Sequence, residues 1–319
     1  MSQPSWGIVS TIKAPTETVL KFVSYHLDQG ASDITVFLDD ANLETARALQ
    51  SHPKVQAVLT DDAYWQDWLG RRPPKHQLRQ VRNATRHYRK NQHLDWIAHI
   101  DVDEFLCTEG SIADELSKCP PEASEFRIAP CESLCLDDQT DLDPELTYCK
   151  TLTGKGDAGL RLEQKLYPQF GGVLKSGFVS HVVGKVFVRS GLKNAKIAIH
   201  RAFENKDQRV PDYQCSTIEL CHKHIENWEK WLSIMQFRLE RGSYRAELET
   251  NLSPASGRIQ RHQLFSSLTE DGTADLRAFF EEVCLATPRL RGLLAEEGCL
   301  REYRLDLDAK LAKHFPDYD

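Results

Sequence analysis

Two aspartates separated by one residue, Asp101 and Asp103, carry the clearest chemical signal in the sequence. They follow an apolar run at residues 95–100 that predicts a strand, and side chains at positions i and i+2 of extended backbone point to the same side. Paired carboxylates in this geometry supply the oxygen ligands that hard divalent cations prefer. The pair therefore predicts a Mg²⁺ or Mn²⁺ site, where the cation would neutralise a diphosphate and stabilise charge on a leaving group.

The first hundred residues alternate between short apolar runs and amphipathic segments, which predict strands and helices in turn. The expected order is a strand at 6–11, a helix at 16–29, a strand at 34–38, a helix at 43–50, a strand at 55–59 and a basic helix at 71–91. This order indicates an α/β fold with a mostly parallel sheet flanked by helices. Ligands of such sheets bind at the carboxyl edge, where Asp101 and Asp103 are expected.

Beyond residue 110 the pattern is less regular. Apolar runs predict strands at 126–135, 184–188 and 196–200, and the glycine-containing segment between the first two is expected to form long loops. Residues 227–241 predict a helix with one apolar stripe, and the remainder is expected to be mainly helical. The predicted organisation is a sheet-forming domain at 1–225 and a mainly helical C-terminal region at 226–319 packed on it.

Composition restricts the classes of function. The 319 residues include 40 Lys or Arg and 47 Asp or Glu, a formal charge of −7, so no global positive field favours a nucleic-acid partner. Nine cysteines without a CxxC pair predict reduced, mostly buried thiols. The sequence has no signal-peptide pattern and no apolar run of transmembrane length, so we expect a cytoplasmic protein with at most peripheral membrane contact.

The stretch Asp95 to Leu106, DWIAHIDVDEFL, resembles the metal-site segment of family 2-like GT-A glycosyltransferases, in which a Trp-containing strand runs into D-x-D-E-F. This resemblance implies a GT-A (Rossmann-like) nucleotide-sugar-binding and catalytic domain over residues 1–225. It also implies a metal-dependent, inverting transfer of a sugar from a nucleotide-sugar donor, UDP-linked by preference, to a glycan or lipid-linked glycan acceptor. The cofactor would be Mn²⁺ or Mg²⁺.

Other positions resemble the family pattern by their place in the chain. Tyr25-His26-Leu27 resembles the family's "yHl..G" segment, and Leu220-Cys221-His222 before a helix resembles a segment whose His contacts the metal or the diphosphate. The resemblance therefore implies Asp101, Asp103 and His222 as metal ligands, with His224 and His200 as further candidates. Donor-binding roles are implied for Thr11, Asp39, Asp40, Gln80 beside Arg79, Asp101, and Lys185 in a Gly-Lys pair.

An inverting transfer needs a general base that takes the proton of the acceptor hydroxyl as this hydroxyl attacks the anomeric carbon. Acidic residues in the segment PCESLCLDD, on the expected acceptor side of the metal strand, are the candidates: Glu132, Asp137 and Asp138. Asp103 completes the predicted catalytic set.

Three other interpretations compete with this one. A haloacid-dehalogenase-like phosphatase also uses two aspartates at i and i+2, but it places them after its first strand and lacks a Phe at the position of Phe105. A zinc site built from Cys215, Cys221, His222 and His224 has unsuitable cysteine spacing. A non-catalytic GT-A-like protein that binds a nucleotide or a glycan would keep the same sequence pattern.

Overall fold

A computed structural model describes residues 3–137, 142–205, 207–240, 261–270 and 272–318. The fold is mixed α/β, and the chain forms two compact units. The first comprises Met1–Pro130, Val183–Cys221 and Leu305–Asp319, and the second comprises Cys131–Val182 and His222–Arg304. Strands β6 (Glu125–Ser133) and β12 (Asp212–His222) each begin in the first unit and end in the second.

The first unit is built on a sheet whose core is four parallel strands. Their spatial order is β4 (Trp96–His99), β1 (Trp6–Ile12), β2 (Asp33–Leu38) and β3 (Val55–Leu59). Strand β8 (Lys185–Arg189) pairs antiparallel with β4, and β6 pairs antiparallel with β8. The carboxyl ends of β1, β2 and β4 consequently meet at one edge of the sheet, and that edge carries the predicted site.

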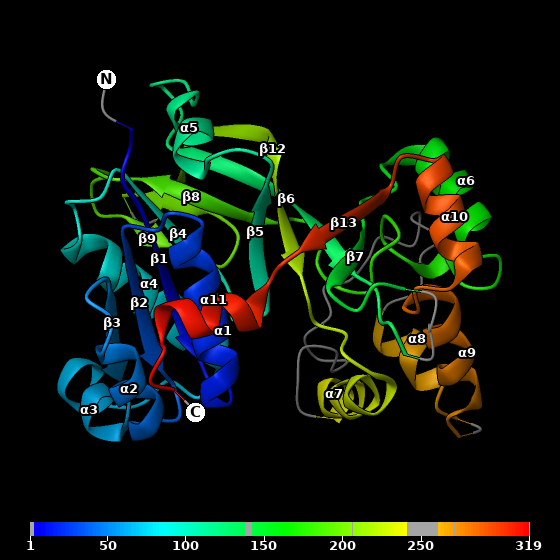
Figure 1. The fold of residues 1–319 in the computed structure, drawn as a ribbon, viewed down its shortest axis with the longest axis horizontal. Helices are drawn as coiled ribbons and strands as arrows, with labels where there is room; N and C mark the ends of the chain where they lie inside the picture. Colours follow the sequence, from blue (N-terminus) through cyan, green and yellow to red (C-terminus); the bar gives the residue numbers. More distant parts are fainter. Residues whose placement is uncertain (1–2, 138–141, 206, 241–260, 271, 319) are drawn as a thin grey trace. The chain divides into compact units, whose positions relative to one another are not determined.

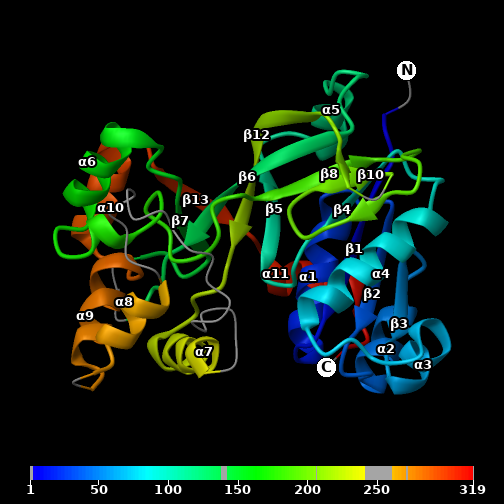
Figure 2. The same cartoon turned by 180° about the vertical axis from the view of Figure 1, so that it is seen from behind.

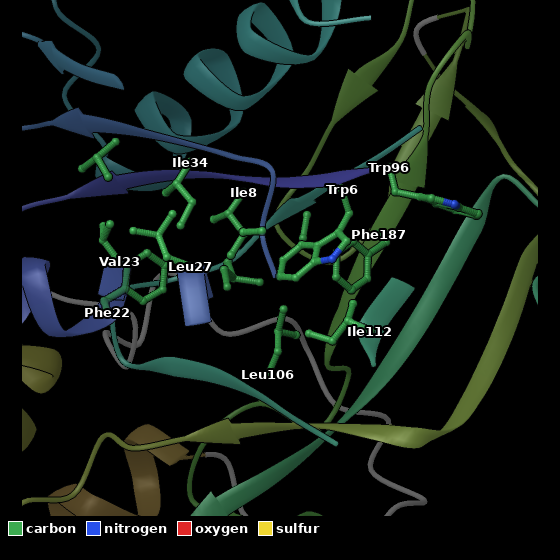
Figure 3. Close-up of a cluster of buried hydrophobic side chains, with 14 of the residues drawn as sticks. Trp6, Ile8, Phe22, Val23, Leu27, Ile34, Trp96, Leu106, Ile112 and Phe187 are labelled. Atoms are coloured by element: carbon green, nitrogen blue, oxygen red, sulfur yellow. The ribbon is translucent and has the colours of Figure 1, made fainter. Parts of the chain in front are cut away.

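Helices cover both faces of this sheet (Figure 1). Helix α1 (Thr16–Asp28) and α11 (Leu307–His314) lie on one face, and α4 (His76–Lys90) lies on the other, as Figure 2 shows from behind. Apolar residues of α1 recur with helical spacing and face the sheet, and Gly30, with φ 95°, follows the helix end. Figure 3 shows the resulting core, in which Trp6, Ile8 and Ile34 meet Phe22, Val23 and Leu27.

Shorter elements complete the first unit. They are α2 (Leu43–Gln50), α3 (Asp62–Leu69), β5 (Glu104–Thr108), α5 (Ile112–Ser117), β9 (Lys196–Ile197), β10 (Ala202–Glu204) and β11 (Gln208–Arg209). β12 pairs with β5 and β6, and β9, β10 and β11 form a separate three-stranded sheet. Residues of β9 and β10 join the apolar cluster beneath α4, so this small sheet extends the cover on that face.

The second unit combines two strands with helices. Its elements are β7 (Leu146–Lys150), α6 (Gly156–Leu166), η1 (Gly171–Val173), α7 (Trp228–Glu240), α8 (Arg261–Ser267), α9 (Ala274–Val283), α10 (Pro288–Glu296) and β13 (Leu300–Arg304). β13 pairs antiparallel with β7 along its full length. The core is aromatic, with Trp231 of α7 packed on Phe279 and Phe280 of α9.

The elements predicted before residue 110 are confirmed, with ends shifted by a few residues. The predicted loops between residues 136 and 183 are wrong in part, because this segment contains β7 and α6. Glycines usually indicate loops, but Gly159 lies inside α6. A glycine is needed there because a Cβ would come within 2.9 Å of the Gly154 backbone. The third predicted strand is shorter, with β9 ending at Ile197.

The two compact units do not follow the expected boundary at residue 225. Residues 131–182 belong to the second unit, and residues 305–319 return to the first. Phe315 is buried in the core of the first unit, and Asp308 forms an ion pair with Lys21 of α1 at 2.6 Å. The C-terminal helix is therefore a structural part of the sheet-forming unit.

All nine cysteines are buried and free of disulfides, as their spacing predicted. Within the described ranges, no helix has both the length and the apolar character that crossing a bilayer requires.

His26, in the segment that resembles "yHl..G", has a structural role. Its Nδ1–H donates to the Phe22 carbonyl oxygen at 2.8 Å, and its Nε2 accepts from the Leu106 amide at 3.4 Å. Complete burial lowers the pKa of His26 from 6.5 to about 3, although the hydrogen bond to Phe22 opposes this shift. The neutral imidazole ties α1 to β5.

We therefore expect acid to destabilise the protein through His26. Between pH 6.5 and about 3 the unfolded chain binds a proton at this position and the folded chain does not, so stability falls as pH falls. At pH 5 the loss from this group is about 2 kcal/mol relative to pH 7. His26→Gln keeps an acceptor for Leu106 but cannot titrate, so urea unfolding should show a smaller loss between pH 7 and pH 5. An identical loss in both proteins would contradict this role.

Candidate metal site

Asp101 lies at the carboxyl end of β4, and three polar side chains surround it. Lys185 Nζ lies 2.6 Å from Oδ2, and the Gln80 side-chain amide donates to Oδ1. Glu104 closes the turn, since its Oε2 accepts from the Asp101 amide at 2.8 Å and its own amide donates to the Asp101 carbonyl at 3.1 Å. The Asp101 side chain is nevertheless 30% exposed, so a ligand can reach it.

Lys185 lies beneath the carboxylates and is fully buried. It pairs with Asp101 and, at 3.1 Å, with Glu104, which is also fully buried. Burial alone would lower the pKa of Lys185, but the two carboxylates overcome this effect and raise it above its usual value. The chain reaches this position through Gly184, whose φ is 70° and where a Cβ would come within 2.0 Å of the Ile128 carbonyl oxygen.

These residues fit a divalent cation by charge and by donor type. Asp101 and Glu104 pair with the one ammonium of Lys185, and Asp103 adds a third carboxylate two residues after Asp101 in the chain, so these four residues have a formal charge of −2. Asp103 is partly exposed in the turn that follows β4. Each carboxylate oxygen has two lone pairs, so Asp101 can accept from Lys185 and Gln80 and still ligate a cation. Asp101 and Asp103 are the residues that would hold it.

His99 was not predicted as a site residue. It lies two residues before Asp101 on β4, where it is 3% exposed, and its Nδ1 lies 3.3 Å from the Ala198 carbonyl oxygen. Burial first, and then the charge of Lys185, lower its pKa from 6.5 to about 4. The neutral ring therefore adds no positive charge beside Asp101. The sequence feature that could have identified His99 is its position as the polar residue of an otherwise apolar strand.

Asp39, at the end of β2, is the centre of a second polar cluster. Arg79 binds its carboxylate with both Nε and Nη2, at 2.7 and 2.6 Å. His76 Nδ1 lies 3.0 Å from Oδ2, and Arg72 lies 3.2 Å from Oδ1 while also donating to the Asp39 carbonyl. Burial would raise the pKa of Asp39, but the bonds to His76 and Arg79 hold it well below its usual range. This carboxylate orients three basic side chains.

The other predicted donor-binding residues have different surroundings. The Thr11 hydroxyl is buried and accepts from Asn83 of α4 at 3.1 Å. Asp40 is exposed and accepts from the Asn42 amide at 3.3 Å, in the turn before α2. The structure therefore brings Gln80 and Lys185 to Asp101, whereas Thr11 bonds to α4 and Asp40 bonds within its own turn. His200 Nδ1–H donates to the Gly184 carbonyl oxygen at 2.7 Å, beside the start of β8.

Glu132 is fully buried in the second unit, at the end of β6. Its carboxylate accepts from the Val179 and Ser180 amides at 3.0 and 2.7 Å, and lies 3.0 Å from His224 Nε2 and 3.2 Å from Lys150 Nζ. Burial would raise the pKa of Glu132, but the Lys150 charge and the His224 hydrogen bond hold it well below its usual value. Such a group is a weak base without access to solvent, so its surroundings favour a structural role.

The histidine predicted as a metal ligand belongs to the second unit. The ring of His222 lies 4.4 Å from that of His224 and 5.2 Å from that of His181. Burial lowers the pKa of His224 to about 4, despite its bond to Glu132. Asp137, another predicted base, is partly exposed and accepts from the Trp228 amide at the start of α7, at 2.8 Å. Asp138 lies outside the described residues.

Glu132→Gln is expected to destabilise the protein by about 3–5 kcal/mol, because it leaves the buried Lys150 ammonium without its carboxylate. Urea unfolding at pH 7 measures the loss. Glu145→Gln, at an exposed position of the same unit, is the matched control and should change stability by less than about 0.5 kcal/mol. A Glu132→Gln protein with normal stability and a large loss of turnover would instead identify Glu132 as the base.

Comparison with known proteins yields similarities to solved structures and no family. No protein-family model and no curated protein matches the chain. Among solved structures, the crystal structure of HddC from Yersinia pseudotuberculosis is similar with a TM-score of 0.29 and 12% sequence identity. The match covers 43% of this chain and 65% of that chain. The function must therefore be argued from the site itself.

Proposed function

We propose that the protein is a metal-dependent glycosyltransferase of the GT-A type that uses a nucleotide-sugar donor, UDP-linked by preference. The observation that carries this proposal is the arrangement at the end of β4, where Asp101 is fixed by Lys185, Glu104 and Gln80, and Asp103 follows two residues later. The formal charge of −2 on this group suits one Mn²⁺ or Mg²⁺ ion. The bound cation would supply Lewis-acid stabilisation of the diphosphate leaving group.

The residues around Asp101 would orient the metal-binding carboxylate and the bound nucleotide. Lys185 and Gln80 hold the Asp101 carboxylate in one orientation, which is the arrangement that tunes metal-binding carboxylates in proteins. Asp39 is engaged by Arg72, His76 and Arg79, so we assign the contact with the nucleotide to these basic side chains. Arg72 and His76 are 32% and 40% exposed, and both can donate to a phosphate, a ribose or a base.

The acceptor hydroxyl must lose a proton during an inverting transfer. Glu132 accepts from or pairs with four donor groups and is buried, whereas Asp137 is partly exposed; the general-base role of either residue stays a prediction from the sequence. The ligand role of His222 stays a prediction from the resemblance. The acceptor class is a glycan or a lipid-linked glycan, again by resemblance.

The test is release of the nucleoside diphosphate from a panel of UDP-, GDP- and dTDP-sugars, with and without Mn²⁺ and with excess EDTA. We expect metal-dependent release from one nucleotide class, which EDTA abolishes. Tight nucleotide binding without release from any sugar would identify a GT-A-like binding protein that lacks turnover. Metal-dependent release of inorganic phosphate from phosphate esters would instead support the phosphatase interpretation.

A further inference from the structure

A strongly basic segment leads into α4 and continues through it. Residues 71–90 contain eight Lys or Arg and no Asp or Glu, although the whole chain has a formal charge of −7. Helix α4 lies on the outer side of one sheet face, in front of β1 and β2 in Figure 2. Residues 71–90 therefore carry a formal charge of +8 within a chain whose formal charge is −7.

Half of these cations have partners in the fold. Arg72 and Arg79 bind Asp39, Arg86 lies over the Trp68 ring at 4.6 Å, and Arg89 donates to the Ala195 carbonyl oxygen. The other four are exposed, and within the described chain none of them forms an ion pair or a side-chain hydrogen bond: Arg71, Lys75, Arg82 and Lys90. Neither fold stability nor the proposed metal site uses these four charges.

Two exposed leucines accompany these four cations. Leu78 is 41% exposed and lies three residues after Lys75 and four before Arg82, so the three side chains share one helix face. Leu69, at the end of α3, is 37% exposed and precedes Arg71 by two residues. Cations interspersed with exposed leucines suit a bilayer surface, because headgroups attract the charges and the acyl boundary accepts the apolar side chains. A nucleic acid or a soluble anionic glycan would not bury the leucines.

We propose that the face of α4 formed by Lys75, Leu78 and Arg82, together with Leu69 and Arg71 in the segment that leads into this helix, binds bilayers that contain anionic phospholipids; these five residues are called the α4 surface. The contact is peripheral and reversible, since few apolar side chains are available and the attraction is electrostatic. The rest of the chain has a net negative charge, so electrostatic attraction turns this surface toward the membrane. This inference does not depend on the proposed glycosyltransferase activity.

The experiment is co-sedimentation of the full chain with vesicles of phosphatidylcholine, either alone or with about one third phosphatidylglycerol. We expect a partition coefficient at least about tenfold higher for the anionic vesicles, lost at high salt. Arg71→Gln/Lys75→Gln/Arg82→Gln should lower it by about tenfold or more, because each cation contributes severalfold. Leu78→Ser should lower it about threefold or more and leave the salt dependence unchanged.

The matched control is Lys54→Gln/Lys155→Gln/Lys193→Gln, which removes three exposed lysines elsewhere and changes the net charge equally. This control should bind anionic vesicles like the unmodified chain. Equal loss in both triple variants would overturn the proposal, as would binding to heparin or RNA with no binding to anionic vesicles. Manganese-dependent nucleotide binding, measured on the same variants, reports on the metal site separately.

Discussion

Replacing Lys185 with methionine is expected to cost about 3–5 kcal/mol of stability, the largest loss for any residue near the candidate site. The substitution leaves Glu104, which is fully buried, without its positive partner at 3.1 Å. It also removes the ammonium that positions Asp101. Urea unfolding at pH 7, followed by circular dichroism, measures the loss.

A second variant separates this charge effect from a simple packing defect. Glu104→Gln combined with Lys185→Met removes both members of the buried pair, so it should recover a large part of the stability lost in Lys185→Met. The donor-binding role that the resemblance implies for Lys185 does not by itself require a loss of stability. A loss below about 1 kcal/mol for Lys185→Met would contradict the structural role.

Asp103→Asn is expected to weaken metal-dependent nucleotide binding by about a hundredfold or more, because it replaces a charged cation ligand with a neutral amide. Stability should change by less than about 1 kcal/mol, since the side chain is partly exposed and lies in the turn between β4 and β5. Calorimetric titration with a nucleoside diphosphate and Mn²⁺ measures the affinity.

Asp67→Asn is the matched control for this variant. Asp67 is an exposed aspartate of α3, and its replacement changes the net charge in the same way. We expect nucleotide affinity to remain within about twofold of that of the unmodified chain. If Asp103→Asn and Asp67→Asn bind the nucleotide with equal affinity, Asp103 is not a ligand at this site.

The sheet-forming elements could be predicted because their signals are local. Each strand from β1 to β4 is a short apolar run, and α1 has helical apolar spacing that ends before Gly30. Helix α6 was missed because its glycines resemble loop residues, although Gly159 serves close backbone packing. The return of α11 to the first unit could not be foreseen, since it depends on contacts such as Lys21 with Asp308.

The place of Asp101 and Asp103 after a strand could be predicted from the sequence, whereas the side-chain contacts around Asp101 could be predicted only in part. The spacing of Asp101 and Asp103 after a strand indicated the sheet edge, which the structure confirms. Spacing could not show that Lys185 lies buried beneath Asp101, because this pair joins segments 84 residues apart. The same limit applies to Asp39, whose bidentate partner Arg79 lies 40 residues away.

The most direct test of the central claim is thermal unfolding of the unmodified protein with UDP, GDP or dTDP, each with and without Mn²⁺. A ligand that binds only the folded state stabilises it by about 2.7 kcal/mol at a free concentration of about 100 times Kd. We predict a rise in Tm with one nucleotide, UDP by preference, and only when Mn²⁺ is present. A folded protein whose Tm responds to none of the three nucleotides would contradict the proposed metal-dependent glycosyltransferase.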